Sequence, residues 1–194
     1  MEQPEIQWLA EYRKGNVESL GKLVEHYRRP LYAFILKMTQ NHADADEVFQ
    51  EVWFRAIRSM DTYKQEKFLS WLFRIAHNLV IDRARKAKPM VDLQRNAGEG
   101  DEDPIESRVA GKGLGPDAEV SSREVGRRII AAVEKLPEDQ KEVFLMRTEA
   151  DLSFKEIAKI QRVSINTALA RMQYALNKLR LELQGDYDAL ARGS

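Results

Sequence analysis

Side chains suited to contact nucleic acid are concentrated in residues 153–180. Ser153 and Glu156 form a capping-box pattern that starts a helix, and Ser164 can cap a second, longer helix after the apolar period breaks at 161–163. The pattern predicts a helix-turn-helix, although an ordinary helical hairpin with a solvated polar face fits it too. We expect the core side of the second helix to hold Ile165, Leu169, Met172, Leu176 and Leu179. Its other side presents groups that can contact phosphates and base edges: Asn166, Thr167, Ala170, Arg171, Gln173, Tyr174 and Lys178.

Charge is segregated along the chain, although the formal net charge is zero. Residues 55–88 carry nine basic and three acidic side chains, and 153–180 carry six basic and one acidic. Residues 43–51 carry four acids and no base. Attraction to phosphates is local at physiological salt, because screening acts within roughly 8 Å. Two basic segments can therefore bind nucleic acid while the acidic segment binds another partner; solvated helix faces are the alternative for each.

Helical periodicity runs through the first half of the chain, over 5–14, 17–39, 43–60 and 68–87. Another helix is expected after Leu136, because Pro137 and Glu138 suit a first turn. Nothing alternates with period two for long enough to predict a strand. The sequence therefore predicts an all-α fold.

Residues 88–120 separate the two helical regions. They hold five of the ten glycines, three of the six prolines and an acidic run, without apolar periodicity. Such a composition is typical of a flexible linker. We expect two small helical domains, 1–87 and 123–183, joined by a flexible acidic linker, 88–122, and followed by a tail, 184–194.

Several classes of function are disfavoured by the composition. The chain has no cysteine, and its three histidines, His26, His42 and His77, are isolated, so we expect no metal and no other cofactor. It has no phosphate-binding glycine loop and no nucleophile beside a recognisable base, so we do not expect an enzyme. It has no apolar run long enough to span a membrane and no signal-peptide pattern, which favours a cytoplasmic protein without membrane insertion.

Two long segments of the chain resemble one bacterial family. They are ADADEVFQEVWFRAIRSMDTYKQEKFLSWLFRIAHNLVIDRARK (43–86) and LPEDQKEVFLMR (136–147) with LSFKEIAKIQRVSINTALARMQYALNKLR (152–180). In this order they resemble regions 2 and 4 of the extracytoplasmic-function (ECF) sigma factors, the small two-domain members of the sigma-70 family. The resemblance runs over about 17–87 and 123–180. It implies a transcription initiation factor that directs core RNA polymerase to promoters.

The resemblance also implies roles for individual residues. In the helix expected at 43–60, the clamp helices of the largest polymerase subunit would be bound by Asp46, Phe49, Gln50, Glu51 and Arg55. The −10 element would be contacted and opened by Tyr63, Lys64, Lys67, Phe68, Arg74, His77, Asn78, Arg83 and Arg85. The −35 element would be read by Arg162, Ser164, Asn166, Thr167, Ala170, Arg171, Gln173, Tyr174 and Lys178. For Trp53, core packing and polymerase contact are equally consistent with the sequence, whereas periodicity favours core packing for Trp71.

Some positions depart from the family pattern. A basic residue is usual where Leu169 stands, arginines are usual at Tyr174 and Leu176, and glycine is usual at Asn166. An atypical −35 sequence is one expected consequence. A greater reliance on protein contacts, to the polymerase flap or to an anti-sigma factor, is another. The family implies a monomer when free of partners. The rival interpretation is a stand-alone helix-turn-helix regulator, which binds an operator without polymerase.

Overall fold

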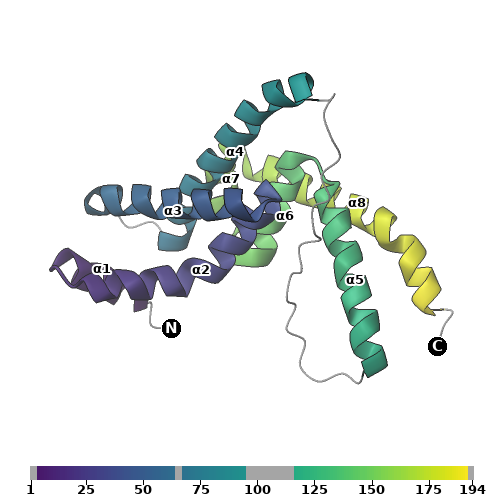
Figure 1. Ribbon diagram of the computed structural model, residues 1–194, viewed down its shortest axis with the longest axis horizontal. Helices are drawn as coiled ribbons and strands as arrows, with labels where there is room; N and C mark the ends of the chain where they lie inside the picture. Colours follow the sequence, from purple (N-terminus) through teal and green to yellow (C-terminus); the bar gives the residue numbers. More distant parts are fainter. Residues whose placement is uncertain (1–3, 64–66, 95–115, 192–194) are drawn as a thin grey trace. The chain divides into compact units, whose positions relative to one another are not determined.

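The computed structural model describes residues 4–63, 67–94 and 116–191, and its side-chain description covers 4–61, 63, 67–86 and 125–184. Every regular element in these ranges is helical, which confirms the all-α fold (Figure 1). The elements are α1 (Pro4–Arg13), α2 (Val17–Thr39), α3 (His42–Ser59), the short 3₁₀ helix η1 (Met60–Thr62), α4 (Phe68–Gln94), α5 (Pro116–Glu134), α6 (Glu138–Ala150), α7 (Phe154–Gln161) and α8 (Ile165–Ala191).

The chain divides into two compact units. The first lies within Met1–Ala97 and Leu145–Ile165, and the second lies within Gly98–Phe144 and Asn166–Ser194. The segment Leu145–Ile165 therefore belongs to the same unit as the N-terminal helices. The sequence instead groups it with the rest of 123–183, and that domain boundary stays a prediction.

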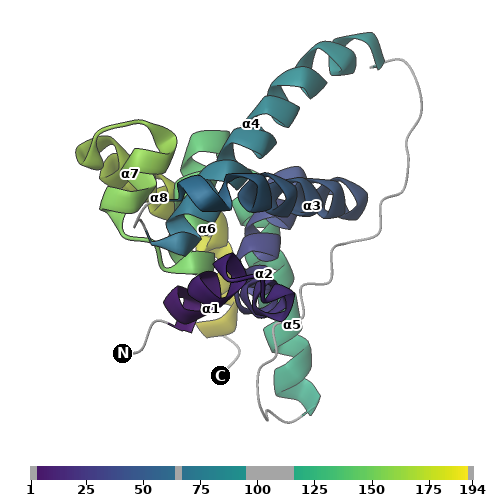
Figure 2. The same ribbon diagram turned by 90° about the vertical axis from the view of Figure 1, so that its left-hand side faces the viewer.

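In the first unit, α2 packs against α1, α3 and α4, and α3 packs against α4 (Figure 2). Local signals start these helices: the side chain of Asn16 accepts a hydrogen bond from the Glu18 amide at the start of α2, and that of Asn41 does the same for Asp44 in α3. Gly15, with a φ of +95°, makes the turn between α1 and α2. The core is aromatic and aliphatic, and its fully buried members include Leu23, Leu31, Phe34, Ile35, Val52, Leu72 and Phe73.

In the second unit, α8 buries a narrow stripe of small side chains and is held by ionic contacts. Ala168, Ala175 and Leu179 are buried on α8, as are Ala132 and Val133 on α5. Among the side chains described in this unit, the other buried apolar residues are Leu136 and Val143. At the end of α5, Lys135 pairs with Glu182 of α8 at 2.9 Å. In the first turn of α6, Asp139 pairs with Arg171 of α8, also at 2.9 Å.

The helices extend beyond the predicted domain ends. Residues 88–94 belong to α4 and 116–122 to α5, so the predicted linker is helical at both ends, and 95–115 lie outside the described residues. Pro116 at the first position of α5 suits a helix start, because its missing N–H would have no partner there. The predicted tail is part of α8 as far as Ala191. These helical ends were not predicted, because the glycines and acidic residues close to them in sequence are typical of a flexible linker.

The structure contains the capping box and the turn predicted for the helix-turn-helix. Ser153 and Glu156 form both hydrogen bonds of the capping box: the Ser153 amide donates to the Glu156 carboxylate at 2.8 Å, and the Glu156 amide donates to the Ser153 hydroxyl at 3.3 Å. Helix α7 ends at Gln161, Arg162 adopts a left-handed conformation with a φ of 57°, and α8 begins at Ile165. The turn is closed by the Val163 amide, which donates to the Ala158 carbonyl at 2.9 Å.

Removing the cap should weaken the fold measurably. Because Ser153→Ala leaves an N-terminal amide of α7 without its acceptor, we expect the free energy of unfolding of the full chain to fall by about 1 kcal/mol in urea denaturation at neutral pH. Lys159→Ala, at an exposed residue of the same helix, is the control for a substitution in α7 that leaves the cap in place. An unchanged urea midpoint in Ser153→Ala would contradict the assignment of the cap.

The same cap should be sensitive to acid. Burial alone would raise the pKa of Glu156, but hydrogen bonds from Ser153 and Ser70 and the charge of Lys67 outweigh it and hold the pKa below its usual value. A carboxyl group with a lowered pKa in the folded state stabilises that state above its ordinary pKa. The stabilisation is lost as the pH falls through the lowered pKa, so the Ser153→Ala deficit should shrink there.

Candidate protein and nucleic-acid interfaces

The predicted polymerase-binding residues lie together on α3. Asp46, Gln50 and Arg55 are exposed, and the carboxylate of Glu51 pairs with Arg55 at 2.6 Å. Phe49 is half-buried, with its ring edge-on to Tyr32 at 5.6 Å. This face combines acidic, amide and apolar groups, which suits a protein partner that carries basic side chains. Binding itself stays a prediction.

Aromatic residues of α3 divide between the core and the surface. Trp53 is 6% exposed and belongs to the core, which settles the alternative that the sequence leaves open. Phe54, which the sequence analysis does not single out, is 54% exposed, and the guanidinium of Arg58 lies 5.5 Å from the centre of its ring. Phe54 falls outside the stripe of Val48, Val52 and Ala56, so helical spacing could have placed it on the surface.

Tyr32 ties α2 to the acidic face. Its hydroxyl donates to Asp46 at 2.7 Å. Burial, followed by this hydrogen bond and the charge of Asp46, raises the pKa of Tyr32 to about 12. The phenol therefore stays protonated at neutral pH and continues to donate, which orients the Asp46 carboxylate.

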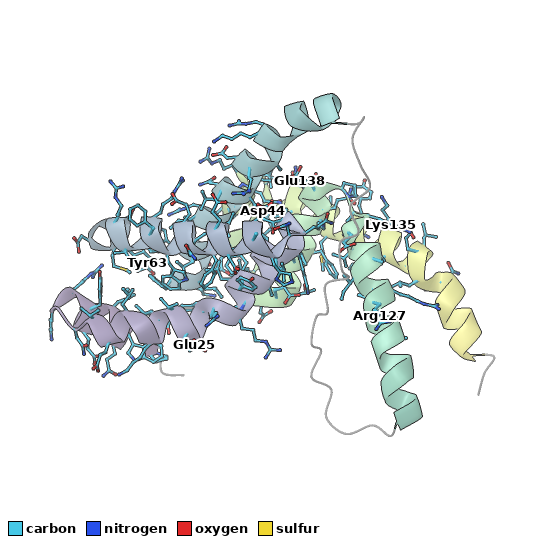
Figure 3. The ribbon with its side chains drawn as sticks, viewed as in Figure 1. Glu25, Asp44, Tyr63, Arg127, Lys135 and Glu138 are labelled. Atoms are coloured by element: carbon cyan, nitrogen blue, oxygen red, sulfur yellow. The ribbon has the colours of Figure 1, made fainter. Side chains whose placement is uncertain are left out.

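Arg83 faces α3 and not the basic side of α4. Its guanidinium pairs with Asp44 at 2.5 Å and with Glu47 at 2.9 Å, and this pairing lowers the pKa of Glu47 (Asp44 is labelled in Figure 3). Arg83 was predicted to contact −10 DNA, but these two ion pairs make it a link between α3 and α4. Residues 55–88 contain nine basic side chains, and this number alone does not show which of them face α3.

The other side of α4 carries a basic and polar stripe, here called the α4 stripe: Lys67, Arg74, Asn78 and Arg85. Their spacings of seven, four and seven place them on one side of the helix, continued from Lys67 just before its first turn. Lys67, Asn78 and Arg85 are exposed and Arg74 is half-buried. Arg83 lies on the opposite side by the same spacing. His77 is half-buried beside the stripe.

Contacts within the first unit already engage part of this stripe. Helix α7 packs against α4, and Glu156 accepts a hydrogen bond from Ser70 at 2.8 Å and pairs with Lys67 at 3.4 Å. Arg85 pairs with Asp82 on its own helix at 3.0 Å. The Lys67 side chain is nevertheless 72% exposed, so its pairing with Glu156 is weakened by solvent.

Tyr63 follows η1 and is supported by aromatic rings. Its ring lies 4.9 Å from that of Trp71 and 5.4 Å from that of Phe68 (Tyr63 is labelled in Figure 3). Tyr63 is half-buried, whereas Trp71 is buried, as its spacing predicts. A tyrosine ring held in this way can serve as a stacking surface for an unpaired base. Lys64, predicted at the same loop, lies outside the described residues.

Phe68 needs a correction. It was predicted to contact DNA, but it is 2% exposed, and the centre of its ring lies 5.5 Å from that of Tyr27 and 5.4 Å from that of Trp71. A ring enclosed in this way has no face left for a base. Phe68 instead packs against the ring of Tyr63 and supports it from the core. Two neighbouring aromatic residues look alike in sequence, and only packing distinguishes the exposed one from its support.

Arg13 is a positioning residue that the sequence does not reveal. From the last turn of α1, its guanidinium donates to the carbonyls of Met60 and Tyr63, each at 3.1 Å. It thereby fixes the backbone that presents Tyr63. The partners are 47 and 50 residues away in the chain, so no local pattern could have indicated them.

We expect Arg13→Ala to loosen this backbone. Promoter opening by the protein with core polymerase should fall severalfold, because two charge-assisted hydrogen bonds are lost, while affinity for core polymerase should stay unchanged. Lys14→Ala, at the exposed neighbouring residue, is the matched control. Opening that is equal in both variants and in the wild type would contradict a positioning role for Arg13.

The exposed side of α8 differs from the expected one. Ile165, Leu169 and Leu176, predicted to face the core, are 46%, 43% and 48% exposed. Leu179 is buried as predicted, but the other buried residues of this stripe are Ala168 and Ala175, because alanines let α8 approach its neighbours closely. Asn166, Thr167, Gln173 and Tyr174 are exposed as predicted, as are Arg162 and Ser164 in the turn, and Ala170 is half-buried.

Two of the predicted −35 cations are engaged within the protein. Arg171 pairs with Asp139 through its Nε at 2.9 Å, and Lys178 donates to the Lys135 carbonyl at 3.0 Å (Lys135 is labelled in Figure 3). Both side chains leave α8 on the side of the second unit's other helices. Arg180, which was not predicted, is exposed on the same side of α8 as Leu169.

Within the described part of the chain, no three histidine or carboxylate side chains are grouped so that they could hold a metal ion. No helix described here is both long and apolar enough to cross a membrane.

Comparisons with known proteins agree with this architecture. Residues 23–89 match the family Sigma-70 region 2, and residues 126–179 match Sigma-70, region 4. The first match contains the α3 face and the α4 stripe, and the second contains the helix-turn-helix. Each of the two predicted domains therefore has its counterpart in the sigma-70 family.

Curated relatives and solved structures of the same kind resemble the chain over most of its length. The ECF RNA polymerase sigma factor SigW of Bacillus subtilis is 29% identical over 91% of this chain and 95% of its own. The ECF RNA polymerase sigma-E factor of Haemophilus influenzae is 26% identical over 89% and 91%. The fold matches that of the sigma factor RpoE from Bartonella quintana, solved with the anti-sigma factor NepR, with a TM-score of 0.69 and 20% identity over 87% and 98%. The chain belongs to the ECF sigma factors of the sigma-70 family.

Proposed function

We propose that the protein directs core RNA polymerase to specific promoters. Its α3 face binds the clamp helices of the largest polymerase subunit, the α4 stripe and Tyr63 capture and open the −10 element, and the helix-turn-helix reads the −35 element. The protein acts by binding, without catalysis of its own and without a cofactor. The polymerase it serves is cytoplasmic, and so is its place of action.

One observation carries this proposal: α3 and α4 present two chemically different surfaces from one compact unit. Arg83 binds Asp44 and Glu47 on the side of α4 that faces α3, so the α4 stripe lies on the other side. A factor that joins an enzyme to DNA needs two such surfaces that can be occupied together. Opening the −10 element costs a few kcal/mol for each base that leaves the stack, and stacking on Tyr63 with phosphate contacts along the stripe offsets that cost.

The proposal includes further partners of the same kind as in the family. The second unit contacts the polymerase flap, and an anti-sigma factor occupies the polymerase-binding surface when the protein is held inactive. Free of these partners, the protein is a monomer. A stand-alone regulator is the second candidate, and it would bind its operator without polymerase.

Co-elution with bacterial core RNA polymerase, followed by run-off transcription from a genomic fragment library, tests the proposal. We expect a stable complex and discrete start sites that are absent with core polymerase alone. Failure to bind core polymerase, together with tight operator binding by the protein alone, would favour the stand-alone regulator.

A further inference from the structure

The face of α8 that is available to a DNA groove carries no arginine or lysine over its first four turns. Exposed polar residues, Asn166, Gln173 and Asn177, run along the middle of this face, and exposed apolar residues, Ile165, Leu169 and Leu176, run along one edge of it. Arg171 and Lys178, the basic residues of α8 within these turns, are bound to Asp139 and to the Lys135 carbonyl. The commonest specific contact to DNA, a bidentate arginine or lysine on guanine, is therefore not provided by these positions.

Leu169 stands at the boundary between these polar and apolar residues. It is the fifth residue of α8, and residues near the N-terminus of a recognition helix are the ones that meet base edges. It is 43% exposed, and the core of the second unit is completed by Ala168 and Ala175 without it. Asn166 and Gln173, at spacings of three and four, flank it on the same side.

An aliphatic side chain in a major groove has one specific partner, the C5-methyl group of thymine. Its neighbour Gln173 carries an amide, which pairs with the N6 and N7 edge of adenine. An A·T pair offers both groups in the major groove. Arg180, exposed on the same side of α8, supplies positive charge that favours DNA over an apolar protein partner.

We infer that Leu169 is a specificity-determining residue that contacts the methyl group of a thymine in the −35 element. The inference rests on the proposed function, because it assumes that α8 enters a promoter. Recognition of the −35 element by this factor then requires A·T pairs at the positions that the first half of α8 contacts. Thymine methyl groups there contribute to recognition as much as hydrogen bonds do.

The test uses the full protein with core polymerase and a promoter obtained from the run-off experiment. Each thymine of the −35 element is replaced singly by deoxyuridine, which lacks only the methyl group and keeps the base pair. We expect about a fourfold loss of holoenzyme affinity at one thymine, the effect of one buried methyl group. Leu169→Ala should show a comparable loss on the normal promoter and no further loss on the deoxyuridine one.

Leu181→Ala is the matched control, because Leu181 is an exposed leucine of α8 more than three turns beyond Leu169. It should keep the full sensitivity to deoxyuridine. The inference is overturned if no thymine of the −35 element is sensitive, or if Leu169→Ala retains the sensitivity of the wild type. If the run-off transcription experiment gives no promoter-specific start site, the proposed function is overturned instead. That outcome is known before any deoxyuridine promoter is tested.

Discussion

Asp46→Ala combined with Gln50→Ala should lower the affinity for core RNA polymerase by about 100-fold. The two side chains are exposed one turn apart on α3, and their removal deletes a carboxylate and an amide from the centre of the α3 face. Asp46→Ala also removes the hydrogen bond from Tyr32. Central interface residues contribute about 1–2 kcal/mol each or more, and 1.4 kcal/mol is a factor of ten. Competition with a labelled wild-type protein for core polymerase measures the loss.

The matched control for this pair is Gln7→Ala combined with Glu25→Ala. It also removes one amide and one carboxylate, both exposed, but from α1 and α2 (Glu25 is labelled in Figure 3). It should bind core polymerase like the wild type. Equal affinities of the two double variants would show that α3 is not the polymerase-binding surface.

Tyr63→Ala should reduce promoter opening by about 10- to 100-fold and leave core binding unchanged. Stacking of a base on an aromatic side chain is worth about 1–3 kcal/mol, and Tyr63 is the half-exposed ring above Trp71 and Phe68. The closed complex, which forms before any base leaves the duplex, should be affected little. Stopped-flow fluorescence of a base analogue in the −10 element measures the rate and the extent of opening.

Tyr63→Phe separates stacking from other roles of this residue. It keeps the ring and its packing on Trp71, so opening should stay within about twofold of the wild type. If Tyr63→Phe were as defective as Tyr63→Ala, the hydroxyl group and not the stacking surface would be what matters. A parallel thermal unfolding experiment identifies any loss that comes from the fold.

The first half of the chain was predictable because its helices are amphipathic and well capped. Asn16 and Asn41 precede α2 and α3, and the apolar stripes of these helices became the core. The polymerase-binding candidates were found together for the same reason: with the apolar side of α3 known, Asp46, Gln50 and Arg55 must lie on the other side.

Helix α8 was harder to interpret because it carries two apolar stripes. One consists of Ile165, Leu169 and Leu176, and the other of Ala168, Ala175 and Leu179. Hydrophobicity favours burial of the leucines, but close packing between helices favours the alanines, and sequence alone does not say how closely the helices approach. Ile165, Leu169 and Leu176 were misjudged on this helix, and Leu169 is now a candidate for reading the promoter.

The roles of residues that contact distant parts of the chain could not be predicted from the sequence. Arg83 was counted among the DNA-binding cations, since nothing local shows that Asp44 and Glu47 neutralise it. Arg13 was missed because its acceptors, the carbonyls of Met60 and Tyr63, come close only through folding. Charge and type can be read from a sequence, whereas the partner of each charge is a property of the fold.

Permanganate footprinting of the −10 region tests the central claim most directly, because this reagent oxidises thymines that have left the duplex. On a promoter identified by run-off transcription, we predict reactive −10 thymines only when the protein and core polymerase are both present. Specific binding of the protein alone to the same fragment, with no polymerase-dependent reactivity, would contradict the account and identify a stand-alone regulator.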